Sequence, residues 1–118
     1  MAIAANIAVA LVAILHLYFM VLEMYFWDKP LGRKAFHLTP EFAAASKSLA
    51  ANQGLYNGFL AAGLVWGLLP GDHGHAIKLF FLGCVVIAGI FGAVTANKKI
   101  LFVQAVPGAV AMALVLVS

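Results

Sequence analysis

The stretch IAANIAVALVAILHLYFMVLEMYFW, from Ile3 to Trp27, decides the fold class, because it is apolar almost throughout and Glu23 is its only charged residue. A helix needs about 20 apolar residues to cross the hydrocarbon core of a bilayer, so this run is long enough. An ionised carboxylate at the centre of such a helix costs about 3 kcal/mol. The stretch therefore predicts a transmembrane helix whose one acidic side chain needs a polar partner.

The composition extends this prediction to the whole chain. Of the 118 residues, 65% are hydrophobic and 9% are charged, whereas soluble domains carry about 25% charged residues. A soluble protein of this length could not bury so much apolar surface. We therefore expect an all-α, membrane-embedded four-helix bundle in which residues 1–118 form a single transmembrane domain.

Four apolar runs can serve as the spans, with approximate bounds 3–27, 49–69, 77–96 and 100–117. Pro107 should bend the fourth span, because a proline cannot donate a backbone hydrogen bond to the preceding turn. Thr39 and Pro40 are typical of a helix start, so the second helix is expected to begin well before its apolar part. A stripe of small residues should let the third helix pack closely, either inside the bundle or at a dimer contact: Cys84, Ala88, Gly92 and Ala96.

The basic residues indicate an orientation. The chain has a net charge of +3 and seven Lys and Arg residues, and all but Lys78 lie in the connections after the first and third spans. Cytoplasmic loops are enriched in Lys and Arg, so both termini are expected outside the cytoplasm. Because these charges do not form a stripe along one helix, we expect the lipid bilayer, and no nucleic acid, as a partner.

Polar side chains converge at one depth of this predicted bundle. His16 and Glu23 are seven residues apart and share one face of the first helix. The remaining members come from the other three spans: Asn52, Gln53, Tyr56, Asn57, Thr95 and Gln104. Two interpretations stay open. The group lines a functional polar pocket, or the amides only join helices through hydrogen bonds of about 1 kcal/mol each.

Other chemistry has weaker support in the sequence. Asp72, His73 and His75 stand together in one turn, but a metal site needs three or four ligands in fixed geometry. His16 has no second strong ligand for haem. We therefore expect no metal and no cofactor, and we assign no catalytic residue.

Three strings together resemble a known bacterial family: HLYFMVLEMYFW (16–27), LAANQGLYNGFLAAG (49–63) and KKILFVQAVPG (98–108). The family is the domain-of-unknown-function family 1304, whose members are small four-helix membrane proteins. The resemblance implies four transmembrane helices and a place in the bacterial inner membrane. It also implies polar motif positions at His16, Glu23, Asn52, Gln53, Tyr56, Asn57, Lys99 and Gln104.

Three functions remain open from the sequence. The first is binding or transport of a small hydrophobic or cationic ligand, with Glu23 as the protonatable group and a homodimer possible. The second is a cofactor-independent, isomerase-like enzyme in which His16 and Glu23 act as general acid and base on a hydrophobic substrate. The third is an accessory protein that binds another membrane subunit.

Overall fold

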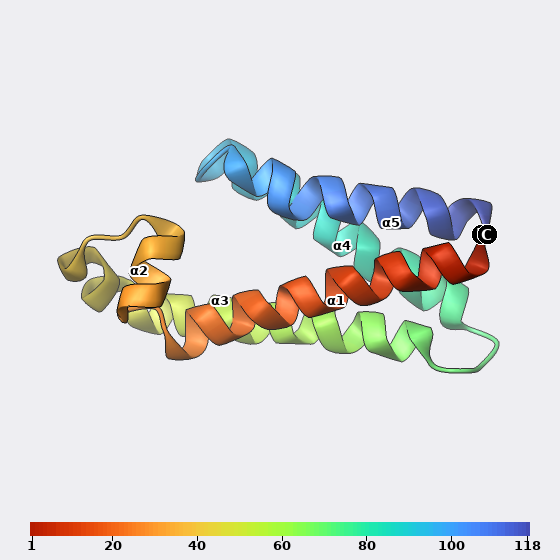
Figure 1. Cartoon of the computed structure of the whole chain (residues 1–118), viewed down its shortest axis with the longest axis horizontal. Helices are drawn as coiled ribbons and strands as arrows, with labels where there is room; N and C mark the ends of the chain where they lie inside the picture. The colour runs from red at the N-terminus through yellow and green to blue at the C-terminus, as the bar shows by residue number, and fades with distance from the viewer. The chain divides into compact units, whose positions relative to one another are not determined.

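The computed structural model describes residues 1–118 and contains only helices and their connections (Figure 1). This confirms the all-α class. There are five α-helices and one π-helical turn, η1. Their bounds are α1 Ala2–Tyr25, α2 Pro30–Phe36, α3 Pro40–Leu68, α4 Gly74–Thr95, η1 Leu101–Ala105 and α5 Val106–Val117.

Two of the helices are long and apolar enough to cross a membrane, namely α1 with 24 residues and α4 with 22. The continuous helical stretch Leu101–Val117 is apolar but shorter. The longest helix is α3 with 29 residues. As expected, it begins at Pro40 and runs unbroken into the apolar part, and its first turn is capped because Phe42 N donates to Thr39 Oγ1 over 3.1 Å.

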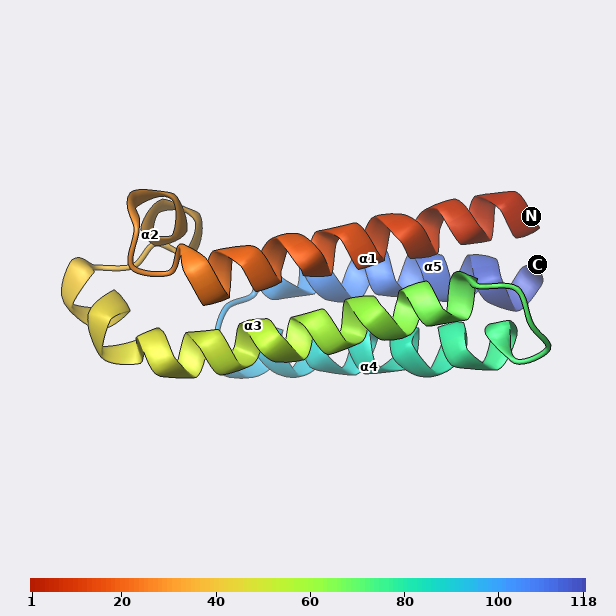
Figure 2. The same ribbon diagram turned by 90° about the horizontal axis from the view of Figure 1, so that it is seen from below.

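The helix α2 was not expected from the sequence, which suggested only a break at Pro30 and Gly32. Proline is tolerated at the first position of a helix, where its missing N–H has no intrahelical acceptor. Pro30 therefore starts a short helix, and α1 ends at Tyr25, two residues before the predicted limit. The last residue of α2 is Phe36, and His37, which follows it as the C-cap, adopts the left-handed conformation with φ 56°. In Figure 2, α2 is seen nearly end-on while α1 lies across the view.

Contacts within the chain group into two compact units, and the division falls inside both α1 and α3. Unit 1 comprises residues 1–14 and 60–118, and unit 2 comprises residues 15–59. Unit 1 therefore contains the beginning of α1, the end of α3, and α4 and α5. Unit 2 contains the end of α1, the whole of α2 and the first part of α3.

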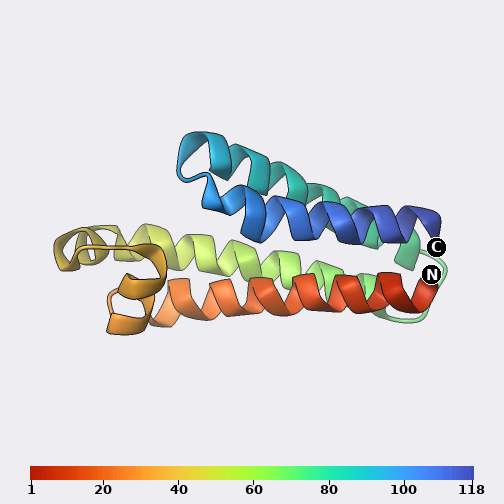
Figure 3. The same cartoon turned by 45° about the horizontal axis from the view of Figure 1, so that its top comes forward.

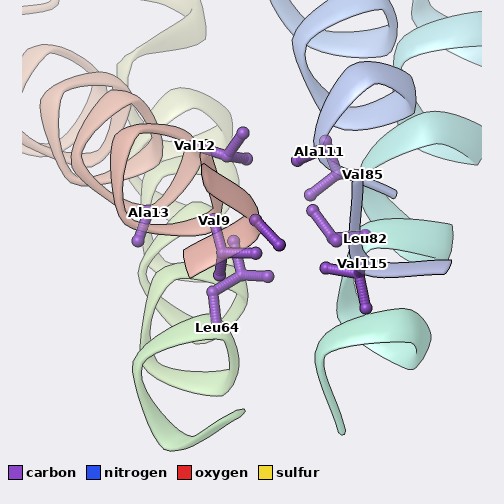
Figure 4. Packing of buried hydrophobic residues seen from close by; sticks show 9 residues of the cluster. Val9, Val12, Ala13, Leu64, Leu82, Val85, Ala111 and Val115 are labelled. Atoms are coloured by element: carbon purple, nitrogen blue, oxygen red, sulfur yellow. The ribbon is translucent and has the colours of Figure 1, made fainter. Parts of the chain in front are cut away.

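Unit 1 has the hydrophobic core of the protein (Figure 4). Its buried side chains come from four helices: Ala5, Val9, Val12, Ala13, Leu64, Leu82, Val85, Ala111 and Val115. Most of these side chains are small or β-branched, which allows the helix backbones to approach closely. The association of these helices thus depends on packing of small side chains.

Glycines set the contact between α4 and α5, which run side by side in opposite directions (Figure 3). A Cβ atom at Gly89 would lie 2.5 Å from the backbone nitrogen of Ala105, and one at Gly108 would lie 2.7 Å from Val85 Cγ1. The buried positions of α4 are Leu82, Val85 and Gly89. Of the predicted stripe, Gly92 packs tightly against Ile100, whereas Ala88 and Ala96 are exposed, so its use at a dimer contact stays a prediction.

The π-helical turn η1 lies directly before Pro107. Val106 N donates to Leu101 O, five residues earlier, so this turn is wider than an α-helical one. Proline removes a backbone donor and crowds the preceding turn, and a π-turn is one way to accommodate this. A bend was expected at Pro107, and the structure has a wider, π-helical turn before this residue.

In unit 2, a set of contacts that we call the latch connects the end of α1 with α2 and the beginning of α3. Trp27 Nε1 donates to Ser46 Oγ over 3.0 Å, and the Trp27 ring packs against Phe36 with ring centroids 4.9 Å apart. Lys47 Nζ lies 3.2 Å from Asp28 Oδ2. This hydrogen bond holds the pKa of the Asp28 carboxyl below its ordinary value.

The glycine contact between α4 and α5 predicts a large difference between two alanine substitutions in one helix. Gly89→Ala should destabilise the protein by about 1–3 kcal/mol, because its methyl group would meet the backbone of Ala105, the last residue of η1. Gly83→Ala should be neutral or stabilising, because its methyl group would meet only Met112 Cε at 3.6 Å. Thermal unfolding in detergent, followed by circular dichroism, measures both. Equal melting temperatures for the two variants would contradict the packing described.

The ion pair of Asp28 predicts a pH dependence of stability. Because the folded-state pKa is lowered, the ionised carboxylate stabilises the folded protein above its unfolded pKa of about 3.9, and this stabilisation is lost as the pH falls through the lowered value. Asp28→Asn should melt slightly below the wild type at pH 6, and the gap should close at the acidic end of a titration. Asp72→Asn, which removes an exposed carboxylate from the turn between α3 and α4, is the matched control. A gap for Asp28→Asn that is independent of pH would contradict the assignment.

Candidate functional site

The acidic residue of the first helix has a polar partner in unit 2. Glu23 of α1 and Asn57 of α3 are both half-buried. Asn57 Nδ2 donates a hydrogen bond to Glu23 Oε1. A carboxylate in an apolar helix is stabilised by such a donor, because the hydrogen bond compensates in part for the water it has lost. The structure therefore joins two residues of the predicted polar group.

Two glycines of α3 make this contact possible. A Cβ atom at Gly54 would lie 2.6 Å from Met24 Cγ and 3.1 Å from Glu23 Cβ. A Cβ atom at Gly58, one turn later, would lie 2.8 Å from Met20 Sδ. Glycines four residues apart let two helix backbones approach closely. Asn57 stands between the two glycines and its short side chain can therefore reach Glu23.

The carboxylate of Glu23 keeps part of its binding capacity. Oε1 accepts the hydrogen bond from Asn57. Oε2 takes part in no hydrogen bond, and it is not among the fully enclosed unpaired atoms of the molecule. A carboxylate has about four lone-pair sites. The pair can thus bind a cation, a proton or a hydrogen-bond donor without losing the Asn57 contact.

His16 lies on α1, seven residues before Glu23, and its side chain is fully buried. Its ring meets the edge of Phe19 at a centroid distance of 5.5 Å. Seven residues correspond to about 10 Å along a helix. His16 and Glu23 thus belong to one helix face but occupy different depths.

The other predicted pocket residues have different surroundings. Asn52, Gln53 and Tyr56 are exposed on α3, although they belong to unit 2 like Glu23. Thr95 and Gln104 belong to unit 1. Thr95 Oγ1 donates to Phe91 O of its own helix over 2.7 Å, and Gln104 is partly buried in η1. That all eight residues serve one pocket therefore stays a prediction.

Sequence reasoning did not identify Gly54 and Gly58 as part of the site. Their spacing of four was visible in GLYNG (54–58), but the polar residues around it drew the interpretation toward hydrogen bonding. In the structure, these two glycines determine how closely α1 and α3 approach each other. The side chain of Asn57 reaches Glu23 because the two helices are this close.

The turn between α3 and α4 contains a small open pocket in unit 1. Its lining includes Trp66, Leu69, Asp72, His73 and Ile77. No group of three or more His, Cys, Asp or Glu side chains with metal-binding geometry occurs in the chain. The polar turn is a loop with an adjoining pocket.

Comparison with known proteins agrees with the resemblance seen in the sequence. The chain is 29% identical over 96 residues to the uncharacterized protein YpaA of Lactococcus lactis subsp. lactis (strain IL1403), covering 80% of this chain and 81% of that protein. No solved structure matches. The family model described as "Protein of unknown function (DUF1304)" matches residues 10–116. The glycines, Glu23 and Asn57 all lie within this match, and the chain belongs to the DUF1304 family.

Proposed function

We propose that the chain is a multi-pass membrane protein with four spans: α1, α3, α4 and the continuous stretch η1–α5. The lengths and apolar composition of α1 and α4 support this proposal. With 29 residues, α3 is about 43 Å long at 1.5 Å per residue, which exceeds a hydrocarbon core of about 30 Å. The exposed large apolar side chains support it too, because they occur along every one of these helices.

In this proposal the protein lies in the bacterial inner membrane with both termini outside the cytoplasm. The connections after α1 and α4 then face the cytoplasm, together with the polar beginning of α3. They contain all basic residues except Lys78, as expected for cytoplasmic segments. Trp27, two residues beyond the end of α1, would then lie at the inner interface, where tryptophan is enriched.

We further propose that the Glu23–Asn57 pair binds a small cationic ligand, so that the protein is a binding protein or transporter. The observation that carries this proposal is the half-buried carboxylate of Glu23, which uses one oxygen for Asn57 and leaves the other without a partner. A pair that served only to join two helices would not need a charged acceptor, because two amides can form the same hydrogen bond. An acidic group within a membrane helix is usually functional.

A second candidate function is an accessory protein that binds another subunit. The exposed polar face of α3, with Asn52, Gln53 and Tyr56, favours it. These side chains could donate hydrogen bonds to a neighbouring membrane helix. The cation-binding proposal requires the carboxylate of Glu23, whereas the accessory-protein proposal does not.

The proposed site predicts that a lipophilic cation binds through Glu23. Tetraphenylphosphonium should bind the purified protein in detergent, and Glu23→Gln should weaken this binding about tenfold or more, because the lost charge interaction is expected to contribute about 1.4 kcal/mol or more in a partly desolvated site. Binding to the wild type should also weaken in acid, since protons and the cation compete for one carboxylate. Equilibrium dialysis measures the affinities.

Glu41→Gln is the matched control for this measurement. It removes the same charge from an exposed position in the first turn of α3 and should leave the affinity unchanged. Circular dichroism of Glu23→Gln checks that the variant retains its helices. Equal affinities of the wild type and Glu23→Gln would refute the cation site.

The proposed topology predicts the sides from which two positions can be labelled. In a Cys84→Ser background, a cysteine introduced by Asp72→Cys should react with a membrane-impermeant maleimide added to spheroplasts. A cysteine introduced by Lys98→Cys should react only in inverted vesicles. The physical reason is that the turn after α3 and the connection after α4 lie on opposite sides of the bilayer. Labelling of both positions from one side would exclude four spans.

A further inference from the structure

The connection between α1 and α3 presents cations that have no acidic partner. Arg33 and Lys34 stand in the last turn of α2, and neither takes part in an ion pair. The nearby Lys47 is already paired with Asp28. Glu41 lies in the first turn of α3, where the helix dipole stabilises its charge. The positive charge of α2 therefore remains uncompensated within unit 2.

We propose that α2 and the beginning of α3 bind the headgroup of an anionic phospholipid, through Arg33 and Lys34. This inference rests on the membrane insertion proposed above and adds a lipid specificity to it. Arg33 is partly exposed and Lys34 is exposed. The Nε atom of Arg33 is enclosed by the protein, so a phosphate would meet the terminal nitrogens of the guanidinium group. Phosphate oxygens are strong acceptors for a guanidinium group, because they can accept two parallel hydrogen bonds.

Exposed apolar side chains on the same two helices favour a lipid as the occupant. Leu31, one helical turn before Lys34 in α2, is 52% exposed, and Phe42, in the first turn of α3, is 58% exposed. A free phosphate or a soluble polyanion would leave both side chains in water. A phospholipid covers both features at once, since its phosphate meets the cations and its acyl chains meet the apolar groups.

The latch holds this segment in place. Trp27 donates a hydrogen bond to Ser46 in α3 and packs against Phe36 at the end of α2. It therefore contacts both helices of the segment. Gly32 supports the same geometry, because a Cβ atom there would lie 1.9 Å from Phe26 O. The backbone of α2 is thus pressed against the end of α1. A preorganised segment binds a headgroup without the cost of ordering a loop.

Trp27 is also a suitable reporter, because the chain has only one other tryptophan, Trp66. The Trp66→Phe variant, reconstituted into vesicles, makes Trp27 the single fluorophore. Phosphatidylglycerol or phosphatidylcholine, brominated at shallow acyl positions, is then titrated into the vesicles at equal mole fractions. Bromine quenches tryptophan on contact, so the ratio of the two quenching curves measures the preference for the anionic lipid at this segment.

The preference for phosphatidylglycerol should fall when the cations are removed. In the Trp66→Phe background, Arg33→Gln with Lys34→Gln should reduce it about fivefold for each charge lost, until no preference remains. The matched control is Lys98→Gln with Lys99→Gln, which removes the same charge from the connection after α4. It should leave the preference intact. An unchanged emission maximum in both variants checks the surroundings of Trp27.

The possible outcomes separate the lipid site from the membrane proposal. Equal quenching by the two lipids would overturn the lipid site and leave the membrane proposal standing. An equal loss of preference in both double variants would also overturn it, because the preference would then reflect the overall charge of the cytoplasmic face. Quenching by neither lipid would contradict membrane insertion itself.

Discussion

The close approach of α1 and α3 at Gly54 and Gly58 is the constraint on which the candidate site depends. Without room for the α1 side chains beside these glycines, the short side chain of Asn57 could not reach Glu23. Asn57 in turn supplies the hydrogen-bond donor that compensates this half-buried carboxylate for part of the water it has lost. The close packing at the two glycines thus makes the Glu23–Asn57 hydrogen bond possible, and in the proposed function this pair binds a ligand.

Unit 1 uses the same physical device for a different purpose. Gly89 brings α4 close to η1, and Gly108 brings α5 close to α4. The surrounding residues are apolar, and the result is a core without a polar site. Association between apolar helices gains little from the hydrophobic effect in a lipid environment, so close packing must stabilise it. The close helix contact of unit 2 differs in that an acidic residue, Glu23, and its amide partner, Asn57, lie beside the glycines.

Much of the fold could be predicted from residue patterns. The all-α class, the start of α3 at Pro40 and the irregular turn before Pro107 follow from hydrophobicity and from the backbone chemistry of proline. The short helix α2 was missed because Pro30 is compatible with both a break and a helix start. The buried positions of α4, which are Leu82, Val85 and Gly89, were not predicted. Ala88 and Gly89 are both small, and periodicity does not say which of two adjacent small residues faces the neighbouring helix.

What the sequence determined by itself is local: which segments are helical, and that Glu23 needs a polar partner, because the cost of an isolated carboxylate is independent of the fold. The tertiary structure decided which partner it has. Asn52, Gln53 and Asn57 are similar amides within two turns of one helix, yet only Asn57 faces α1 between the two glycines. The rotation of α3 about its own axis decides which of these amides faces α1. This rotation is set by packing along the whole contact between the two helices, so it cannot be read from a single stretch of sequence.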